Sequence, residues 1–229
     1  EIKNLKSKYS VSEIKHMSME ENEDEASKVI APERTKAVPR FRKGVYEEVK
    51  GTLRGTAYHR FFEILNYDCC KDYNSIEEYL KTSVAAGKIS EEYAGLINLK
   101  RFEEFLQTDL GKRMGSAYKN GLLFREQPFI MELGADMIDK EYPSDEKILV
   151  QGIVDAFFFE DDKVYIVDYK TDRVEQGKAG EKALVERYHK QLELYADTIS
   201  RVTGKETGGC YIYSTCLKKE ILIEFPSYT

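Results

Sequence analysis

The sequence predicts a mixed α/β domain, in which a central sheet is flanked by helices and a helical insertion follows the first helix. Apolar residues have helical spacing up to about Tyr118, and β-rich runs begin at Leu122. A helical pattern returns over residues 181–202, where we expect Gly208-Gly209 to break it. Two closing strands are expected at Cys210–Cys216 and Glu220–Phe225. A chain of 229 residues is long enough to bury a substantial core.

The first half of the domain is predicted to be helical. A helix is expected over residues 51–66, because apolar residues recur there at four-residue steps. These residues are Leu53, Ala57, Phe61 and Leu65. Ser75 and Glu78 are typical of a capping box, which predicts a second helix that ends near Ala86. Ser90 is a suitable N-cap for a third helix, and a short fourth helix follows.

Three strand patterns come next. Leu122–Leu133 is rich in large apolar residues, and Pro128 restricts it to a sheet edge or a bulge. Leu149–Phe159 and Lys163–Tyr169 are separated only by Glu160-Asp161-Asp162, which indicates a β-hairpin.

We expect the folded domain to cover residues 41–229. Within residues 1–40, Ser10 precedes an apolar helical pattern, which predicts one short capped helix. Residues 20–40 are acidic and contain two prolines, so we expect a flexible linker there.

Composition excludes several classes of protein. The 35 basic and 41 acidic residues give a net charge of −6, which argues against a uniformly basic nucleic-acid coat. No apolar run is long enough to cross a membrane, and no G-x-x-x-x-G-K-[ST] motif indicates a P-loop ATPase. Without a secretory leader or C-x-x-C spacing, the four cysteines are expected to be reduced thiols in a cytoplasmic protein.

The most informative motif ends the second half of the predicted hairpin. Asp168 and Lys170 should point the same way, because side chains alternate along a strand, and Asp155 should lie near Asp168. Two buried carboxylates repel each other, and Mg²⁺ relieves that repulsion while binding phosphate oxygens. The pattern fits metal-assisted phosphodiester hydrolysis, in which Lys170 stabilises developing negative charge. A surface Asp–Lys pair is the simpler alternative.

Other polar residues fit such a site but have simpler explanations. His59 could complete a shell for Mg²⁺ or Mn²⁺, or it could be an ordinary hydrogen-bonding residue. Glu126, inside an apolar strand, needs a metal or an ion-pair partner. Gln191 and Tyr195 share a helix face, where they could contact a DNA backbone or pack locally.

In order, the chain shows G-x-x-x-H, R-E-x-P-F, G-x-x-D, D-Y-K-T-D and Q-x-x-x-Y. Over about residues 45–225 this set resembles the RecB-like nucleases of the PD-(D/E)XK superfamily, which implies a restriction-endonuclease-like core. The resemblance implies a metal held by His59, Asp155, Asp168 and the Tyr169 carbonyl. It also makes Lys170 the catalytic lysine, Glu126 the acidic residue of the first core strand, and Gln191 and Tyr195 DNA-contacting or supporting residues.

Residues 9–15 resemble the start of the nuclease domain in the AddA-type helicase–nuclease family. We therefore expect a fragment of a larger chain, a Mg²⁺-dependent DNA exonuclease in which Mn²⁺ can substitute, acting on double-strand breaks and degrading the 3′-terminated strand. The expected partners are DNA, a helicase portion of the same chain and an AddB-type subunit, with no membrane. The cysteine positions do not match the iron–sulfur arrangement of AddB-type relatives, so no cluster is expected. The alternative is an inactive nuclease-fold module for DNA binding or subunit scaffolding.

Overall fold

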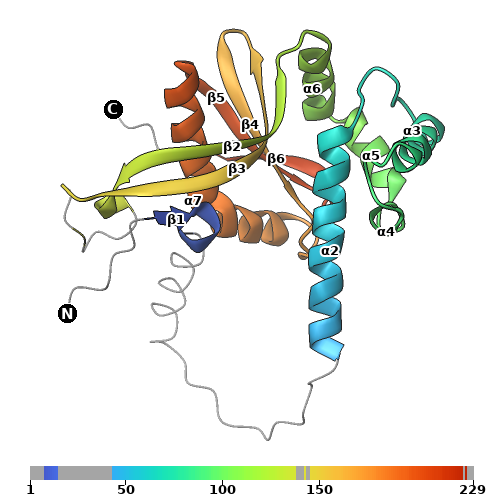
Figure 1. Ribbon diagram of the computed structural model, residues 1–229, viewed down its shortest axis with the longest axis horizontal. Helices are drawn as coiled ribbons and strands as arrows, with labels where there is room; N and C mark the ends of the chain where they lie inside the picture. Colours follow the sequence, from blue (N-terminus) through green and yellow to red (C-terminus); the bar gives the residue numbers. More distant parts are fainter. Residues whose placement is uncertain (1–7, 15–42, 138–141, 143–144, 224, 226–229) are drawn as a thin grey trace, which may run out of the picture.

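The computed structural model describes residues 8–14, 43–137, 142, 145–223 and 225 (Figure 1). These residues form a mixed six-stranded sheet with the order β1-β3-β4-β5-β6, in which β2 pairs with β3. The strands are β1 (Lys8–Ser10), β2 (Leu123–Gly134), β3 (Lys147–Glu160), β4 (Lys163–Lys170), β5 (Thr207–Ser214) and β6 (Lys219–Ile223). The β1–β3 and β4–β5 pairs are parallel, and the other pairs are antiparallel. The predicted α/β class is confirmed.

The helices divide between the two faces of the sheet (Figure 1). The α-helices are α2 (Lys43–Ile64), α3 (Tyr73–Ala85), α4 (Glu91–Ala94), α5 (Leu99–Gln107), α6 (Asp109–Lys119) and α7 (Lys178–Thr203), and a 3₁₀ turn covers Ala135–Met137. Side-chain alternation along β4 separates two cores, because Val164 and Ile166 pack with α7 while Val167 and Tyr169 pack with α2. Among the described residues, no helix is long and apolar enough to cross a membrane.

The helical insertion, α3–α6, builds an aromatic core around the end of α2. Phe62 stacks on Tyr169 of β4, with ring centroids 3.8 Å apart and planes 1° from parallel. Phe102 and Phe105 are fully buried against the Phe62 ring. Burying each of these side chains contributes about 1.5–3 kcal/mol. The insertion therefore fixes α2 over the end of β4.

The predicted hairpin is confirmed. Asp161 and Asp162 form its two-residue turn, with φ of 50° and 64°. The prediction that Pro128 restricts its strand to a sheet edge or a bulge is also confirmed, because β2 pairs only with β3 among the described residues.

Some predicted helix boundaries were wrong. Asp72, not Ser75, is the N-cap of α3, and Ser75 occupies the third helical position. The Asp72 carboxylate accepts the Ser75 N–H at 2.9 Å, and the Ser75 hydroxyl accepts the Asp72 N–H at 3.0 Å. The first helix ends at Ile64 rather than at residue 66. Ser90 does cap a helix, but a new N-cap at Asn98 divides the predicted third helix into α4 and α5.

The break predicted at Gly208-Gly209 was also wrong. Helix α7 ends at Thr203, where Gly204 adopts the left-handed conformation with φ of 66°. Its N–H donates to the Ser200 carbonyl at 2.8 Å, which ends the helix. Gly208-Gly209 instead lies inside β5, which begins three residues before the predicted strand.

Strand β1 was not predicted. It adds Lys8–Ser10 to the sheet beside β3, so the folded unit includes residues before the expected boundary at 41. Val11 and Ile14 are buried in the α7-side core. The predicted cap at Ser10 is confirmed, because its hydroxyl accepts the Glu13 N–H at 3.2 Å. Residues 20–40, the expected linker, lie outside the described residues.

Gly111 sets the close approach of α5 and α6. A Cβ there would lie 2.1 Å from the Phe105 carbonyl oxygen, so Gly111→Ala must push the two helices apart. We expect it to lower the free energy of unfolding by about 1–3 kcal/mol or more in urea denaturation. Gly51→Ala is the matched control, since a Cβ there would meet nothing within 4 Å among the described residues. This change should raise the free energy of unfolding by up to about 1 kcal/mol. Equal stability of the two variants would contradict this packing.

Candidate active site and metal centre

Helix α2 places His59 beside Asp155, inside β3, and beside Tyr169, near the end of β4. The buried residues Tyr58, Phe61 and Phe62 anchor the helix in the aromatic core. Earlier on α2, the Arg54 guanidinium donates to the carbonyl of Thr171, just after β4, at 3.0 Å. The His59 ring lies edge-on to Tyr169, with centroids 6.3 Å apart, and its side chain is 31% exposed. The imidazole is therefore positioned by packing and still accessible to a ligand.

The β3–β4 register brings two carboxylates together, as predicted. Ala156 pairs with Val167 at the end of the β3–β4 ladder, so Asp155 and Asp168 are each the next residue beyond the last pair. Asp155 Oδ2 accepts the Tyr169 N–H at 2.8 Å, and Asp155 Oδ1 lies 3.3 Å from His59 Nδ1. These two contacts fix the orientation of the Asp155 carboxylate.

Glu126 comes close to Asp155 through an irregularity in β2. Arg125 pairs with Ala156 and Gln127 pairs with Val154, while Glu126 leaves the ladder with φ of 48°. A left-handed conformation costs a non-glycine residue about 1–2 kcal/mol. Such strain is typical of functional sites, and here it occurs directly opposite Asp155.

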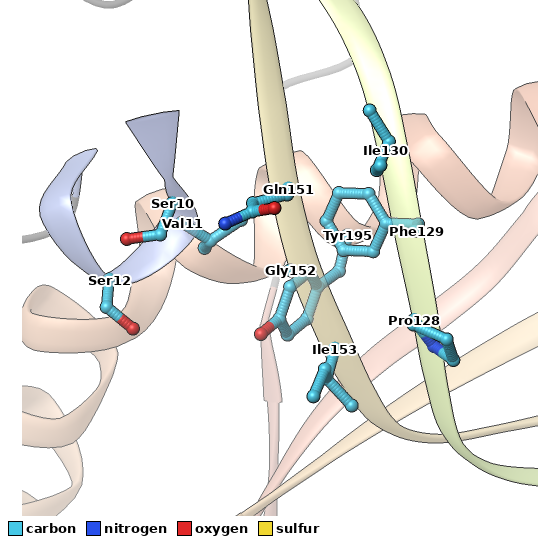
Figure 2. Close-up of a pocket in the computed structure, with 10 residues that line it drawn as sticks. All are labelled: Ser10, Val11, Ser12, Pro128, Phe129, Ile130, Gln151, Gly152, Ile153 and Tyr195. Carbon is cyan, nitrogen blue, oxygen red and sulfur yellow. The ribbon is translucent and has the colours of Figure 1, made fainter. Parts of the chain in front are cut away.

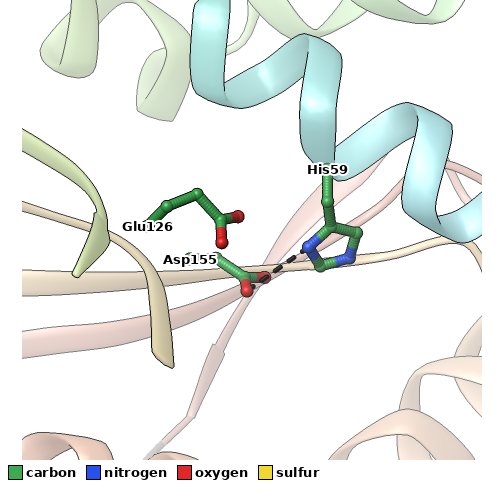
Figure 3. A group of neighbouring side chains, drawn as sticks. All are labelled: His59, Glu126 and Asp155. Atoms are coloured by element: carbon green, nitrogen blue, oxygen red, sulfur yellow. Dashed lines mark ion pairs between the residues drawn. The ribbon is translucent and has the colours of Figure 1, made fainter. Parts of the chain in front are cut away.

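His59, Glu126 and Asp155 form a cluster suited to a divalent cation (Figure 3). One ligand atom from each side chain lies within 4.8 Å of the others. An imidazole and two carboxylates are a donor set that Mg²⁺ and Mn²⁺ accept. The carboxylates of Glu126 and Asp155 repel each other in partly buried surroundings, and a cation would relieve that repulsion. The residues therefore fit a metal.

Asp168 and Lys170 form a second group next to this cluster. Lys170 Nζ lies 2.6 Å from Asp168 Oδ2, and both side chains are largely buried. Gln191 Nε2 donates to Asp168 Oδ1 at 3.1 Å and also lies 3.0 Å from the Tyr195 hydroxyl. The predicted shared direction of Asp168 and Lys170 is confirmed. Gln191 supports Asp168 directly, and Tyr195 contacts Gln191.

The pKa shifts reflect this crowding of charges. Burial, and then the charge of Asp155, raises the pKa of Glu126 to about 7. Burial also raises the pKa of Asp168 to about 6, although the charge of Lys170 opposes the shift. Burial acts to raise the pKa of Asp155, but the hydrogen bond and charge of His59 outweigh it and hold this pKa below its usual value. Burial acts to lower the pKa of Lys170, but Asp168 and Asp155 raise it overall.

Sequence reasoning missed the support around Lys170. The ammonium lies 4.1 Å from the centroid of the Tyr188 ring, which is a cation–π contact. The Tyr188 hydroxyl donates to the Asp172 carboxylate, which also accepts from Arg187 at 2.7 Å. Asp172 ends the D-Y-K-T-D motif, and Tyr188 lies three residues before Gln191 on the same helix. These two spacings could have indicated that Asp172 and Tyr188 lie near Lys170.

Two implied ligands lie outside the three-residue cluster. Both oxygens of Asp168 face protein groups, one toward Lys170 and one toward Gln191. Tyr169 contributes its backbone N–H, which binds Asp155, and its ring packs in the aromatic core. The roles implied for Asp168 and for the Tyr169 carbonyl as metal ligands stay predictions.

A separate cavity of about 720 Å³ lies between the N-terminal segment and the β2–β3 pair (Figure 2). Tyr195 forms part of its wall and packs edge-on against Phe129, with centroids 5.8 Å apart. Gly152 leaves room for the Phe129 ring, because a Cβ at position 152 would lie 2.8 Å from that ring. None of the three clustered residues lines this cavity, so it is not the metal centre.

Comparison with known proteins finds a family match and several relatives. A model of the PD-(D/E)XK nuclease superfamily matches residues 34–225. A relative from Clostridium perfringens (strain SM101 / Type A), named as an ATP-dependent helicase/nuclease subunit, is 34% identical over 234 residues, which cover 96% of this chain and 18% of that protein. A relative of the same name from Thermoanaerobacter sp. (strain X514) is 37% identical over 215 residues, which cover 91% of this chain and 17% of that protein. The chain thus spans less than a fifth of the length of these relatives.

Proposed function

This chain belongs to the PD-(D/E)XK nuclease superfamily, and from that premise we propose that it is a Mg²⁺-dependent DNA exonuclease. The observation that carries the proposal is the cluster of His59, Glu126 and Asp155 beside the buried Asp168–Lys170 pair. In this arrangement a cation site adjoins a fixed ammonium group, as hydrolysis of a phosphodiester requires.

We propose that His59, Glu126 and Asp155 hold the cation, with Asp168 and the Tyr169 carbonyl as further ligands. When bound, a divalent cation supplies positive charge that stabilises a phosphate undergoing attack. Lys170 directs its ammonium group toward the same phosphate and is held in place by Asp168 and the Tyr188 ring. Gln191 holds the Asp168 carboxylate from the other side.

We also propose that the chain is the nuclease module of a helicase–nuclease that processes double-strand DNA breaks and degrades the 3′-terminated strand. The relatives are named ATP-dependent helicase/nuclease subunits, and this chain matches only a fifth or less of each. This supports a helicase portion in the same full-length chain. The resemblance of residues 9–15 to AddA-type proteins supports an AddB-type partner.

Incubation with linear single-stranded DNA tests the catalytic proposal. Cleavage should require Mg²⁺ or Mn²⁺, stop on addition of EDTA and return when excess Mg²⁺ is added. It should release products progressively from the ends of a linear strand and leave a closed circle intact. Absence of cleavage with either metal, in the presence of the helicase and partner subunits, would instead indicate an inactive nuclease-fold module.

Gln191→Ala is expected to lower kcat by about 10–100-fold, because it removes a hydrogen bond that orients Asp168. Tyr195→Phe is the matched variant. It removes only the hydroxyl that contacts Gln191 and should have a smaller effect. Single-turnover cleavage rates compare the two variants, and thermal denaturation verifies that both are folded. A wild-type rate for Gln191→Ala would contradict the supporting role.

A further inference from the structure

A small cavity opens directly beside the three-residue cluster of His59, Glu126 and Asp155. Its volume is about 310 Å³, and His59 and Glu126 form part of its wall. The helical insertion supplies another part, through Tyr93 and the residues 87–90 that join α3 to α4. This volume is at the lower end of the roughly 300–1,000 Å³ typical of ligand sites, which suits about one nucleotide.

The wall contributed by the insertion is fixed to the helix that carries His59. Arg60 Nε donates to the Lys88 carbonyl at 2.8 Å, and Arg60 Nη1 donates to Glu63 at 2.5 Å. Ile89 is 3% exposed and packs in the aromatic core. The cavity is therefore preformed, since its two sides share these contacts.

The lining offers contacts for each part of a nucleotide. Lys88 is exposed, and within the described part of the chain its ammonium belongs to no ion pair, whereas Arg60 is paired with Glu63. Tyr93 adds a half-buried aromatic ring. A lysine attracts a phosphate, and an aromatic ring packs against a base or a sugar.

We infer that this cavity holds the nucleotide next to the scissile phosphate of a single DNA strand. Lys88 contacts a phosphate of that strand, and Tyr93 packs against its base or sugar. The inference rests on the proposed nuclease function and extends it, because the helical insertion then becomes part of the substrate-binding surface.

Strand binding and cleavage by Lys88→Ala and Tyr93→Ala test this assignment. Affinity for a fluorescent oligothymidine is measured by anisotropy at several salt concentrations, with Ca²⁺ replacing Mg²⁺ to slow cleavage. Lys88→Ala should weaken binding several-fold and reduce the slope of log K against log salt by about 0.7, the contribution of one phosphate contact. In Mg²⁺ it should raise KM and leave kcat unchanged.

Tyr93→Ala should weaken strand binding by about tenfold, as expected for loss of one stacking contact. Tyr93→Phe keeps the ring and should bind within about twofold of the wild type. Lys100→Ala is the matched control, because Lys100 is an exposed lysine of the same insertion that does not line the cavity. Its affinity and salt slope should equal those of the wild type.

The inference is overturned if Lys88→Ala keeps the wild-type affinity and salt slope, or if the wild type binds no single strand. Failure of the proposed function has a different signature. The wild type would then bind the strand, Lys88→Ala would still reduce the slope, and no protein would cleave.

Discussion

Replacing Lys170 with methionine is expected to lower kcat for single-stranded DNA cleavage by about 100-fold or more, because the ammonium that we propose stabilises the phosphate is lost. The same change should lower the free energy of unfolding by about 3–5 kcal/mol at neutral pH, since Asp168 is fully buried and loses its cation. The pKa of Asp168, already raised to about 6 by burial, should rise further. Single-turnover cleavage and urea denaturation measure the two effects.

Two comparisons separate the catalytic effect from the stability effect. Adding Asp168→Asn to Lys170→Met removes the unpaired charge, so stability should largely return while cleavage stays low. Lys147→Met removes a lysine whose distance to Glu132 is also 2.6 Å but whose pair is exposed. It should change stability by less than about 1 kcal/mol. Full cleavage activity in Lys170→Met would contradict the assigned role.

Asp155→Asn is expected to abolish detectable cleavage. Loss of a residue that only hydrogen-bonds to a metal ligand weakens metal binding by roughly 10–100-fold, and loss of the Asp155 charge should weaken Mn²⁺ binding by more than that. Asparagine keeps an oxygen for the Tyr169 N–H but removes the charge between His59 and Glu126. The fold should therefore persist while the cation site fails. Isothermal titration with Mn²⁺ measures the affinity.

Asp172→Asn is the matched control for the metal site. Asp172 is a nearby carboxylate bound by Tyr188 and Arg187, and it lies outside the three-residue cluster. Its Mn²⁺ affinity should equal that of the wild type. If Asp155→Asn binds Mn²⁺ as tightly as Asp172→Asn, the cation is held elsewhere.

Long periodic patterns made most of the fold predictable. Helix α7 and the β3–β4 hairpin extend over enough residues for their apolar periodicity to stand out. Strand β1 has only three residues and is held by parallel pairing with β3, so no local pattern marks it. The third predicted helix is divided at Asn98, whose side chain caps α5 and whose N–H donates to the Tyr58 hydroxyl of α2, a contact that only the folded structure supplies.

The chemistry of the site was more predictable than its geometry. The D-Y-K motif and the β3–β4 hairpin were enough to place Asp155 near Asp168 and to align Asp168 with Lys170. The position of Glu126 depends on its left-handed backbone, which no propensity of glutamate indicates. Tyr188 fits the apolar pattern of α7, and only the folded structure shows its ring beside Lys170.

The central claim is that His59, Glu126 and Asp155 hold the catalytic cation. The most direct test is a crystal structure of the protein with Mn²⁺, in which anomalous scattering locates the ion. The claim predicts one strong peak within coordination distance of His59, Glu126 and Asp155. A protein that cleaves DNA with Mn²⁺ while its crystals show the ion bound away from these side chains would contradict it.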